Sequence, residues 1–106
     1  MTMSVQNESV TDIDTSSKIH IEEPKRYYIV MHNDDQTPIE FVVKVLQELY
    51  HHEPQTAEYL ANKIHIDQKA IVGMFNLEIA EQKMEETHGT SRAHGYPLTV
   101  TLEQAD

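Results

Sequence analysis

Residues 27–41 read YYIVMHNDDQTPIEF, and this stretch decides how the chain folds. Its first five residues are aromatic, β-branched or otherwise apolar, a composition that favours a strand beginning at Arg26. The sequence NDD at 33–35 ends that strand, because Asn and Asp favour turns. A strand followed at once by a polar turn is therefore predicted where the folded part of the chain begins.

Two helices are predicted after this turn. Thr37 has the side chain of an N-cap, Pro38 suits the first helical position, and Glu40 can complete a capping box. Apolar residues then recur at helical spacing, namely Ile39, Val42, Val43, Leu46, Leu49 and Tyr50. The sequence HHE at 51–53 breaks this helix, and Pro54 opens a second one. The apolar residues of the second helix are Ala57, Leu60, Ala61 and Ile64.

A second strand and a third helix follow. Residues 69–75 are predicted as a strand, in which Gly73 either weakens the prediction or marks a bulge. Asn76 is a good N-cap for the next helix, and Gly89 is a natural end for it. Residues 90–95 are predicted as a loop.

Apolar and polar residues alternate over 98–103, which predicts a final strand. The order of elements is then β-α-α-β-α-β. It predicts an α+β sandwich, with three helices packed on a three-stranded sheet.

Composition divides the chain into a tail and one domain. Residues 1–25 are rich in Ser, Thr, Asp, Asn, Gln and Glu and contain no aromatic residue. Such a segment buries too little apolar surface to offset its ordering entropy, so we expect a flexible N-terminal tail. A short strand pairing by Lys18–Ile21 is compatible with this expectation. Residues 26–106 are expected to form the folded domain.

The charge balance excludes several classes of function. The 106 residues contain 8 Lys and Arg against 18 Asp and Glu, a net charge of −10. Phosphate and anionic lipid both require clustered basic residues, so we expect no nucleic-acid and no membrane partner. The absence of cysteine excludes disulfides and thiolate zinc sites. The sequence has no apolar run of about 18 residues and no secretory signal pattern, so we expect a cytoplasmic protein.

No catalytic or metal-binding pattern stands out. The serines lack nucleophile-elbow surroundings, and there is no P-loop or GxGxxG motif. Asp34 and Asp35 are adjacent at a strand end, so their carboxylates are expected to point in different directions. The sequence HHE at 51–53 is typical of a solvated turn, because neighbouring histidines rarely chelate one ion. We therefore expect no enzyme activity, no metal and no cofactor.

The turn at 33–35 carries more hydrogen-bond acceptors than a turn needs. These acceptors stand beside the apolar face of the following helix, and His65 ends the next helix. A ligand that is cationic at one point and apolar next to it suits this arrangement. A peptide N-terminus with a large first side chain is such a ligand.

At these residues the sequence resembles the ClpS adaptors of the N-end rule. The resemblance covers Arg26 to Leu102. Its most specific parts are NDDxTPxEFV at 33–42, and His65 followed by KAxxG at 69–73. Supporting parts are Phe75, ExAExK at 78–83 and PL at 97–98.

The resemblance implies an adaptor and not an enzyme. ClpS proteins capture proteins with an N-terminal Leu, Phe, Tyr or Trp and deliver them to the N-terminal domain of a Clp-family AAA+ unfoldase, of ClpA or ClpC type. By this resemblance Asn33, Asp34 and His65 hold the α-amino group. The implied side-chain pocket consists of Thr37, Ile39, Val42, Ala61, Ile64 and Leu98. Glu78 and Lys83 match positions where the family contacts the unfoldase.

Two alternatives remain at this point. Ile39, Val42, Ile64 and Leu98 also suit an ordinary hydrophobic core. The whole domain could be an acidic protein-interaction module without a pocket for a peptide N-terminus.

The family often has methionine at the positions of Ile39 and Ala61, which predicts a pocket of different shape here.

Overall fold

The computed structural model describes residues 25–105. The tail predicted for residues 1–25 and the pairing of Lys18–Ile21 lie outside these described residues, apart from Lys25 itself. The elements along the chain are β2 (Arg26–His32), α1 (Ile39–Glu48), α2 (Pro54–Asp67), β3 (Lys69–Asn76), α3 (Leu77–Ala93) and β4 (Thr99–Gln104). This order confirms the predicted β-α-α-β-α-β arrangement.

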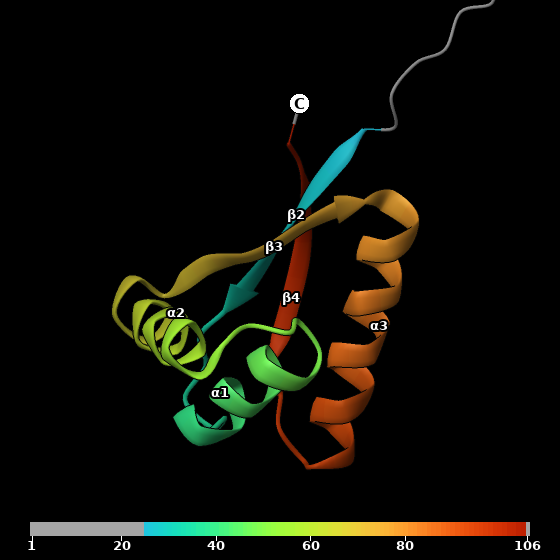
Figure 1. The fold of residues 1–106 in the computed structure, drawn as a ribbon. Helices are drawn as coiled ribbons and strands as arrows, with labels where there is room; N and C mark the ends of the chain where they lie inside the picture. The colour runs from blue at the N-terminus through green and yellow to red at the C-terminus, as the bar shows by residue number, and fades with distance from the viewer. Residues whose placement is uncertain (1–24, 106) are drawn as a thin grey trace, which may run out of the picture.

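The three strands form one antiparallel sheet in the order β3-β2-β4, with β2 at its centre. Figure 1 shows α1 lying between α2 and α3. Ile29 and Met31 of β2 are fully buried, and they share the core with Leu46 of α1. The sheet and the helices therefore enclose a single core, and the predicted α+β class is confirmed.

Gly73 lies at a β-bulge, the second of the two alternatives that the sequence left open. Ile29 pairs with Gly73, but Val30 pairs with Ile71, so Val72 is the additional residue of β3. Val72 is buried, and its carbonyl oxygen lies 2.7 Å from Nε2 of His52. The bulge thus links β3 to the connection between α1 and α2.

The predicted start of α1 is wrong in its detail. The N-cap is Pro38, not Thr37. The Thr37 hydroxyl donates instead to Oδ2 of Asp34 at 2.7 Å, so this side chain does not cap the helix. Proline has no N–H, so Glu40 has no N-cap donor for a capping box. The Thr37 hydroxyl, which was expected to cap the helix, is therefore hydrogen-bonded to the Asp34 carboxylate instead.

The predicted end of α3 is also wrong, because the helix continues past Gly89 to Ala93. Ser91 is fully buried, and its hydroxyl donates to the Thr87 carbonyl at 2.7 Å. Gly95, at φ 81°, takes the left-handed position after the helix, and its N–H donates to the carbonyl of Arg92. The helix thus continues through Gly89 although a mid-helix glycine costs roughly 1 kcal/mol, and it ends shortly before the glycine that takes a positive φ.

Candidate functional site

A cavity of about 410 Å³ lies where the β2–α1 turn faces α2. Its lining comes from the turn (Asn33, Asp34, Asp35, Thr37), from α1 (Ile39, Val42) and from α2 (Ala61, Ile64, His65). The structure thus brings together all the residues predicted for the α-amino group and the side-chain pocket, except Leu98. It adds Asp35, which the sequence analysis did not assign to the site.

Asp34 organises the turn. Its Oδ1 accepts from the backbone N–H groups of Gln36 at 2.8 Å and Thr37 at 2.7 Å, and its Oδ2 accepts from the Thr37 hydroxyl. Partial burial acts to raise the pKa of Asp34, but these hydrogen bonds and the charge of Arg92 outweigh it and lower the pKa below its ordinary value. Asp34 is therefore a fixed negative charge at the edge of the cavity.

Gln68 joins the turn to the end of α2. Its carbonyl accepts from the Asn33 N–H at 2.8 Å, and its Oε1 lies 3.4 Å from Nδ2 of Asn33. Its own amide nitrogen donates to the His65 carbonyl at 3.1 Å. The amide of Asn33 is thereby oriented with Nδ2 engaged, which leaves Oδ1 as an acceptor. Sequence reasoning missed Gln68, whose φ of 76° is unusual for a residue other than glycine.

Arg92 is a second residue that the sequence analysis missed. Its guanidinium donates to the carbonyls of Leu98 at 2.7 Å and Tyr96 at 3.1 Å. Its charge also lowers the pKa of Asp34. An arginine in the last turn of a helix is a recognisable signal, but the helix was expected to end at Gly89.

The apolar wall of the cavity comes from two helices. Ala61 and Ile64 of α2 are 2% exposed, and Val42 of α1 is also buried. Ile39 is 39% exposed and stands at the first position of α1, so it lies at the mouth. Leu98 is not part of the lining, and its burial in the core agrees with the alternative interpretation of that residue.

The cavity is therefore polar and acidic at one end and apolar at the other. Two carboxylates and one amide stand at the polar end, with His65 exposed beside them. Among residues 25–105, no Lys or Arg lines the cavity. This arrangement can accept hydrogen bonds from a cation and bury an apolar group attached to it.

Glu78 and Lys83 do not share one surface. Five positions separate them on α3, which turns their directions about 140° apart. Glu78 is exposed and lines a different cavity of about 410 Å³ beside Tyr27 and Leu77. Lys83 is half-buried, and its Nζ donates to the Leu49 carbonyl at the end of α1 at 2.7 Å.

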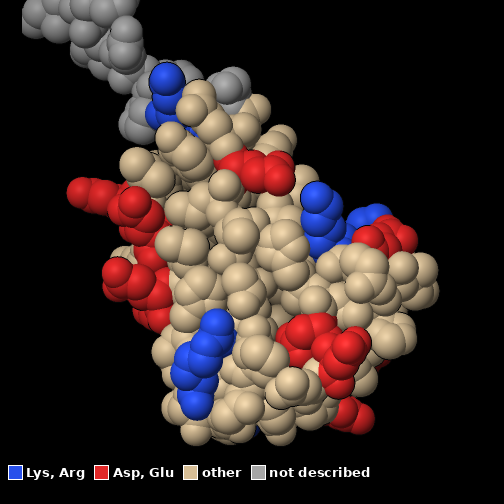
Figure 2. All heavy atoms as spheres, turned by 180° about the vertical axis from the view of Figure 1, so that it is seen from behind, with Lys and Arg blue, Asp and Glu red and all other residues tan. Residues whose placement is uncertain are grey.

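The surface carries few basic residues. On the face in Figure 2, Lys and Arg cover little of the surface, whereas Asp and Glu line the edge at the left and gather again at the lower right. Within residues 25–105 no three metal-ligating side chains lie close enough to hold an ion. No helix in the same range is long and apolar enough to cross a bilayer.

Comparison with known proteins gives concordant results. The sequence model of the family described as "ATP-dependent Clp protease adaptor protein ClpS" matches residues 22–101. The ClpS adapter of Leptothrix cholodnii is 40% identical over 85 residues, which cover 80% of this chain and 74% of the relative. The ClpS adapter of Vibrio cholerae is 35% identical over 94 residues, 89% of each chain.

A solved structure is similar as well. The structure of Agrobacterium tumefaciens ClpS2 bound to L-phenylalaninamide matches with a TM-score of 0.75 and 33% sequence identity. The match covers 77% of this chain and 99% of that one. Fold, family model and relatives agree, so the chain belongs to the ClpS family, the adaptors of the ATP-dependent Clp protease, and is not an enzyme.

Proposed function

We propose that the cavity binds the first residue of proteins that begin with Leu, Phe, Tyr or Trp and have a free α-amino group. The adaptor then delivers these proteins to a Clp-family AAA+ unfoldase of ClpA or ClpC type. The observation that carries this proposal is one cavity with acceptors at one end and an apolar wall at the other. L-Phenylalaninamide, bound to the A. tumefaciens relative, has a free amino group beside an apolar ring and supports the same reading.

The polar end suits an ammonium group. A carboxylate has about four acceptor positions, and Asp34 uses three of them within the turn, which leaves one on Oδ2. Oδ1 of Asn33 and a ring nitrogen of neutral His65 complete the proposed set. Each charge-assisted hydrogen bond contributes about 1.5–3 kcal/mol. Asp35 adds a second negative charge at the same end.

The apolar end suits one large side chain. Burying Leu or Phe is worth about 1.5–3 kcal/mol. Together with two or three ionic hydrogen bonds, the gross gain is about 4–12 kcal/mol, from which association takes several kcal/mol back. An affinity in the micromolar range is consistent with a site of this size.

Fluorescence anisotropy with peptides that differ only at the first residue tests the proposal. Acetylating a Phe-initiated peptide removes its charge and leaves acceptors unpaired, so we expect a loss of at least about 2 kcal/mol, roughly 30-fold. The double variant Asn33→Ala/His65→Ala should lose binding of the free peptide. An acidic interaction module would show neither effect, and equal affinity for both peptides would refute the proposed site.

We further propose that the partner contacts the start of α3. Glu78 is exposed there, and its apolar neighbours Leu77 and Ile79 are exposed too. In this proposal Lys83 holds α1 against α3, because its ammonium group already donates to the Leu49 carbonyl. Glu78→Lys should impair substrate delivery in a reconstituted degradation assay and leave peptide affinity unchanged. A variant that delivers substrate at the normal rate would exclude this contact.

A further inference from the structure

A second cavity adjoins the proposed binding site. It has a volume of about 350 Å³, lies between α1 and α2, and is lined by Ile39, Glu40, Val43, Glu58 and Asn62. Ile39 lines both cavities, so they adjoin at this residue. We call this second cavity the helix groove.

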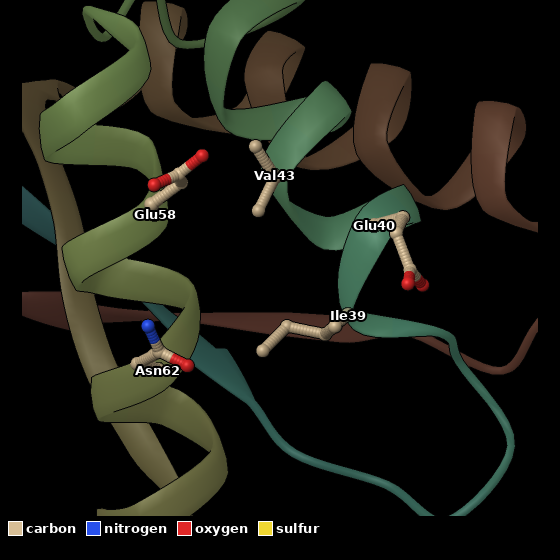
Figure 3. A pocket seen from close by; sticks show the side chains of 5 residues that line it. All are labelled: Ile39, Glu40, Val43, Glu58 and Asn62. Carbon is tan, nitrogen blue, oxygen red and sulfur yellow. The ribbon is translucent and has the colours of Figure 1, made fainter.

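The side chains of the helix groove point into it from both helices. In Figure 3, Ile39 and Asn62 point toward one another, and one turn further along Glu58 points toward Val43. Glu40 stands on the outer side of α1, with its carboxylate directed away from α2. Glu58 is therefore the charge that faces the groove, and Glu40 stands at its rim.

The spacing along α2 matches an extended peptide. His65, Asn62 and Glu58 follow one side of α2, and Glu58 lies about 10.5 Å along the helix axis from His65. An extended chain advances about 3.3 Å per residue. A peptide whose first residue lies beside His65 thus brings its fourth residue level with Glu58. Its third residue ends about 4 Å short, a gap that a long side chain can span.

The helix groove is suited to a cationic side chain. Glu58 is exposed, and it forms no ion pair or hydrogen bond within the part of the chain that the structure describes. Val43 and Ile39 offer apolar surface beside it. Lys and Arg have an apolar stem and a charged head, so the stem can pack on Val43 while the head meets the carboxylate.

We propose that the helix groove binds the residues that follow the first residue of the same peptide, and that it favours Lys or Arg at the third or fourth position. This inference rests on the proposed function of the first cavity. It is carried by the adjacency of the two cavities at Ile39 and by the charge of Glu58, which has no partner among the described residues. The substrate class is then a bulky apolar N-terminus followed by a basic segment.

Anisotropy titrations test this inference with ten-residue peptides that begin Phe-Ala and carry Lys, Gln or Glu at the third and fourth positions. Exposed ion pairs are weak, so we expect the Lys peptide to bind about two- to fivefold more tightly than the Gln peptide. The Glu peptide should bind more weakly than both. The same Lys pair at the ninth and tenth positions should give no gain, and 1 M salt should abolish the effect.

Two variants with the same change in net charge distinguish binding in the helix groove from general electrostatic attraction to an acidic protein. Glu58→Gln should remove the preference for Lys and leave the affinity for the Gln peptide unchanged. Glu85→Gln alters an exposed residue of α3 outside the cavity lining, and it should keep the preference. Glu40→Gln should have a smaller effect than Glu58→Gln.

The outcomes are distinguishable. If none of the peptides binds, the proposed function fails and the inference fails with it. Binding with equal affinity for the Lys and Gln peptides, or an equal loss in both glutamate variants, would overturn the inference alone. A dimer in sedimentation that Glu58→Gln dissociates would assign the groove to a second copy of the chain and would also overturn it.

Discussion

Replacing Ala61 with methionine tests whether the apolar end of the cavity accommodates the first side chain of a substrate. Ala61 is 2% exposed and lines the cavity from α2, opposite Ile39 of α1. Methionine adds three heavy atoms at this position. If each heavy atom takes up about 30 Å³, the volume of one water molecule, the three atoms fill roughly 90 Å³. The whole cavity has a volume of about 410 Å³.

The consequence depends on the size of the ligand. A Leu side chain fits the remaining space, so its affinity should stay within about twofold. A Trp side chain must displace the new methionine, and overpacking costs about 1–3 kcal/mol. That range corresponds to about 5- to 150-fold in affinity, and the flexibility of methionine places the expected loss at the lower end, about fivefold.

The assay is anisotropy with Leu-, Phe- and Trp-initiated peptides against both proteins. Thermal melting of Ala61→Met provides the control, because a loss of fold would weaken all three peptides together. The expected result is a selective loss for Trp. Unchanged Trp affinity in a folded variant, or the same loss for Leu and Trp, would show that Ala61 does not line the pocket for the first side chain.

Further predictions concern the pocket mouth, the bulge and one histidine. Ile39 is stiff at χ1, so Leu peptides should bind at least about tenfold more tightly than Ile or Val peptides, and Ile39→Ala should reduce this ratio to below about threefold in the same titration. Gly73→Ala places a Cβ 2.7 Å from the ring of Phe75, and urea denaturation should show a loss of about 1–2 kcal/mol; an unchanged midpoint would contradict the close contact. His88 accepts from the Val100 N–H at 3.1 Å, and burial, followed by the charge of Arg92, lowers its pKa. Its contribution to the free energy of unfolding should be complete above about pH 6.5, the ordinary histidine value, and should be lost as the pH falls through the lowered value. His88→Gln should therefore lose less stability than the unsubstituted protein between pH 7.5 and 5, and parallel pH profiles would exclude this role.

Local sequence signals predicted the fold because they agree with the tertiary contacts. Asn76 illustrates this agreement, since its side chain accepts from the Ile79 N–H at 3.0 Å, as expected of an N-cap. Pro54 likewise stands at the start of α2. The prediction that the helix ends at Gly89 was wrong, because α3 continues to Ala93 with Ser91 buried in its last turn.

The sequence predicted most residues of the candidate site but not the hydrogen bonds that hold them in place. The acceptors at 33–35 and the helical spacing of Ala61, Ile64 and His65 are visible in the sequence, and the structure places them around one cavity. Thr37 shows the limit, because its hydroxyl serves Asp34 and not the helix. Gln68 and Arg92 act through contacts that depend on how α2 and α3 end, so local sequence patterns carry little information about them.

The contacts between α1 and α3 have a mechanical consequence. The far end of α1 is fixed by the Lys83 ammonium on the Leu49 carbonyl and by a buried hydrogen bond of 2.6 Å between Tyr50 and Thr87. Burial raises the pKa of Tyr50 to about 12, so this phenol keeps its proton at every physiological pH. The near end of α1 carries Ile39 at the cavity mouth. A shift of α3 along its axis would thus either break a buried hydrogen bond or move the cavity mouth with it, so α1 connects the proposed binding pocket mechanically to the helix that carries the proposed docking face.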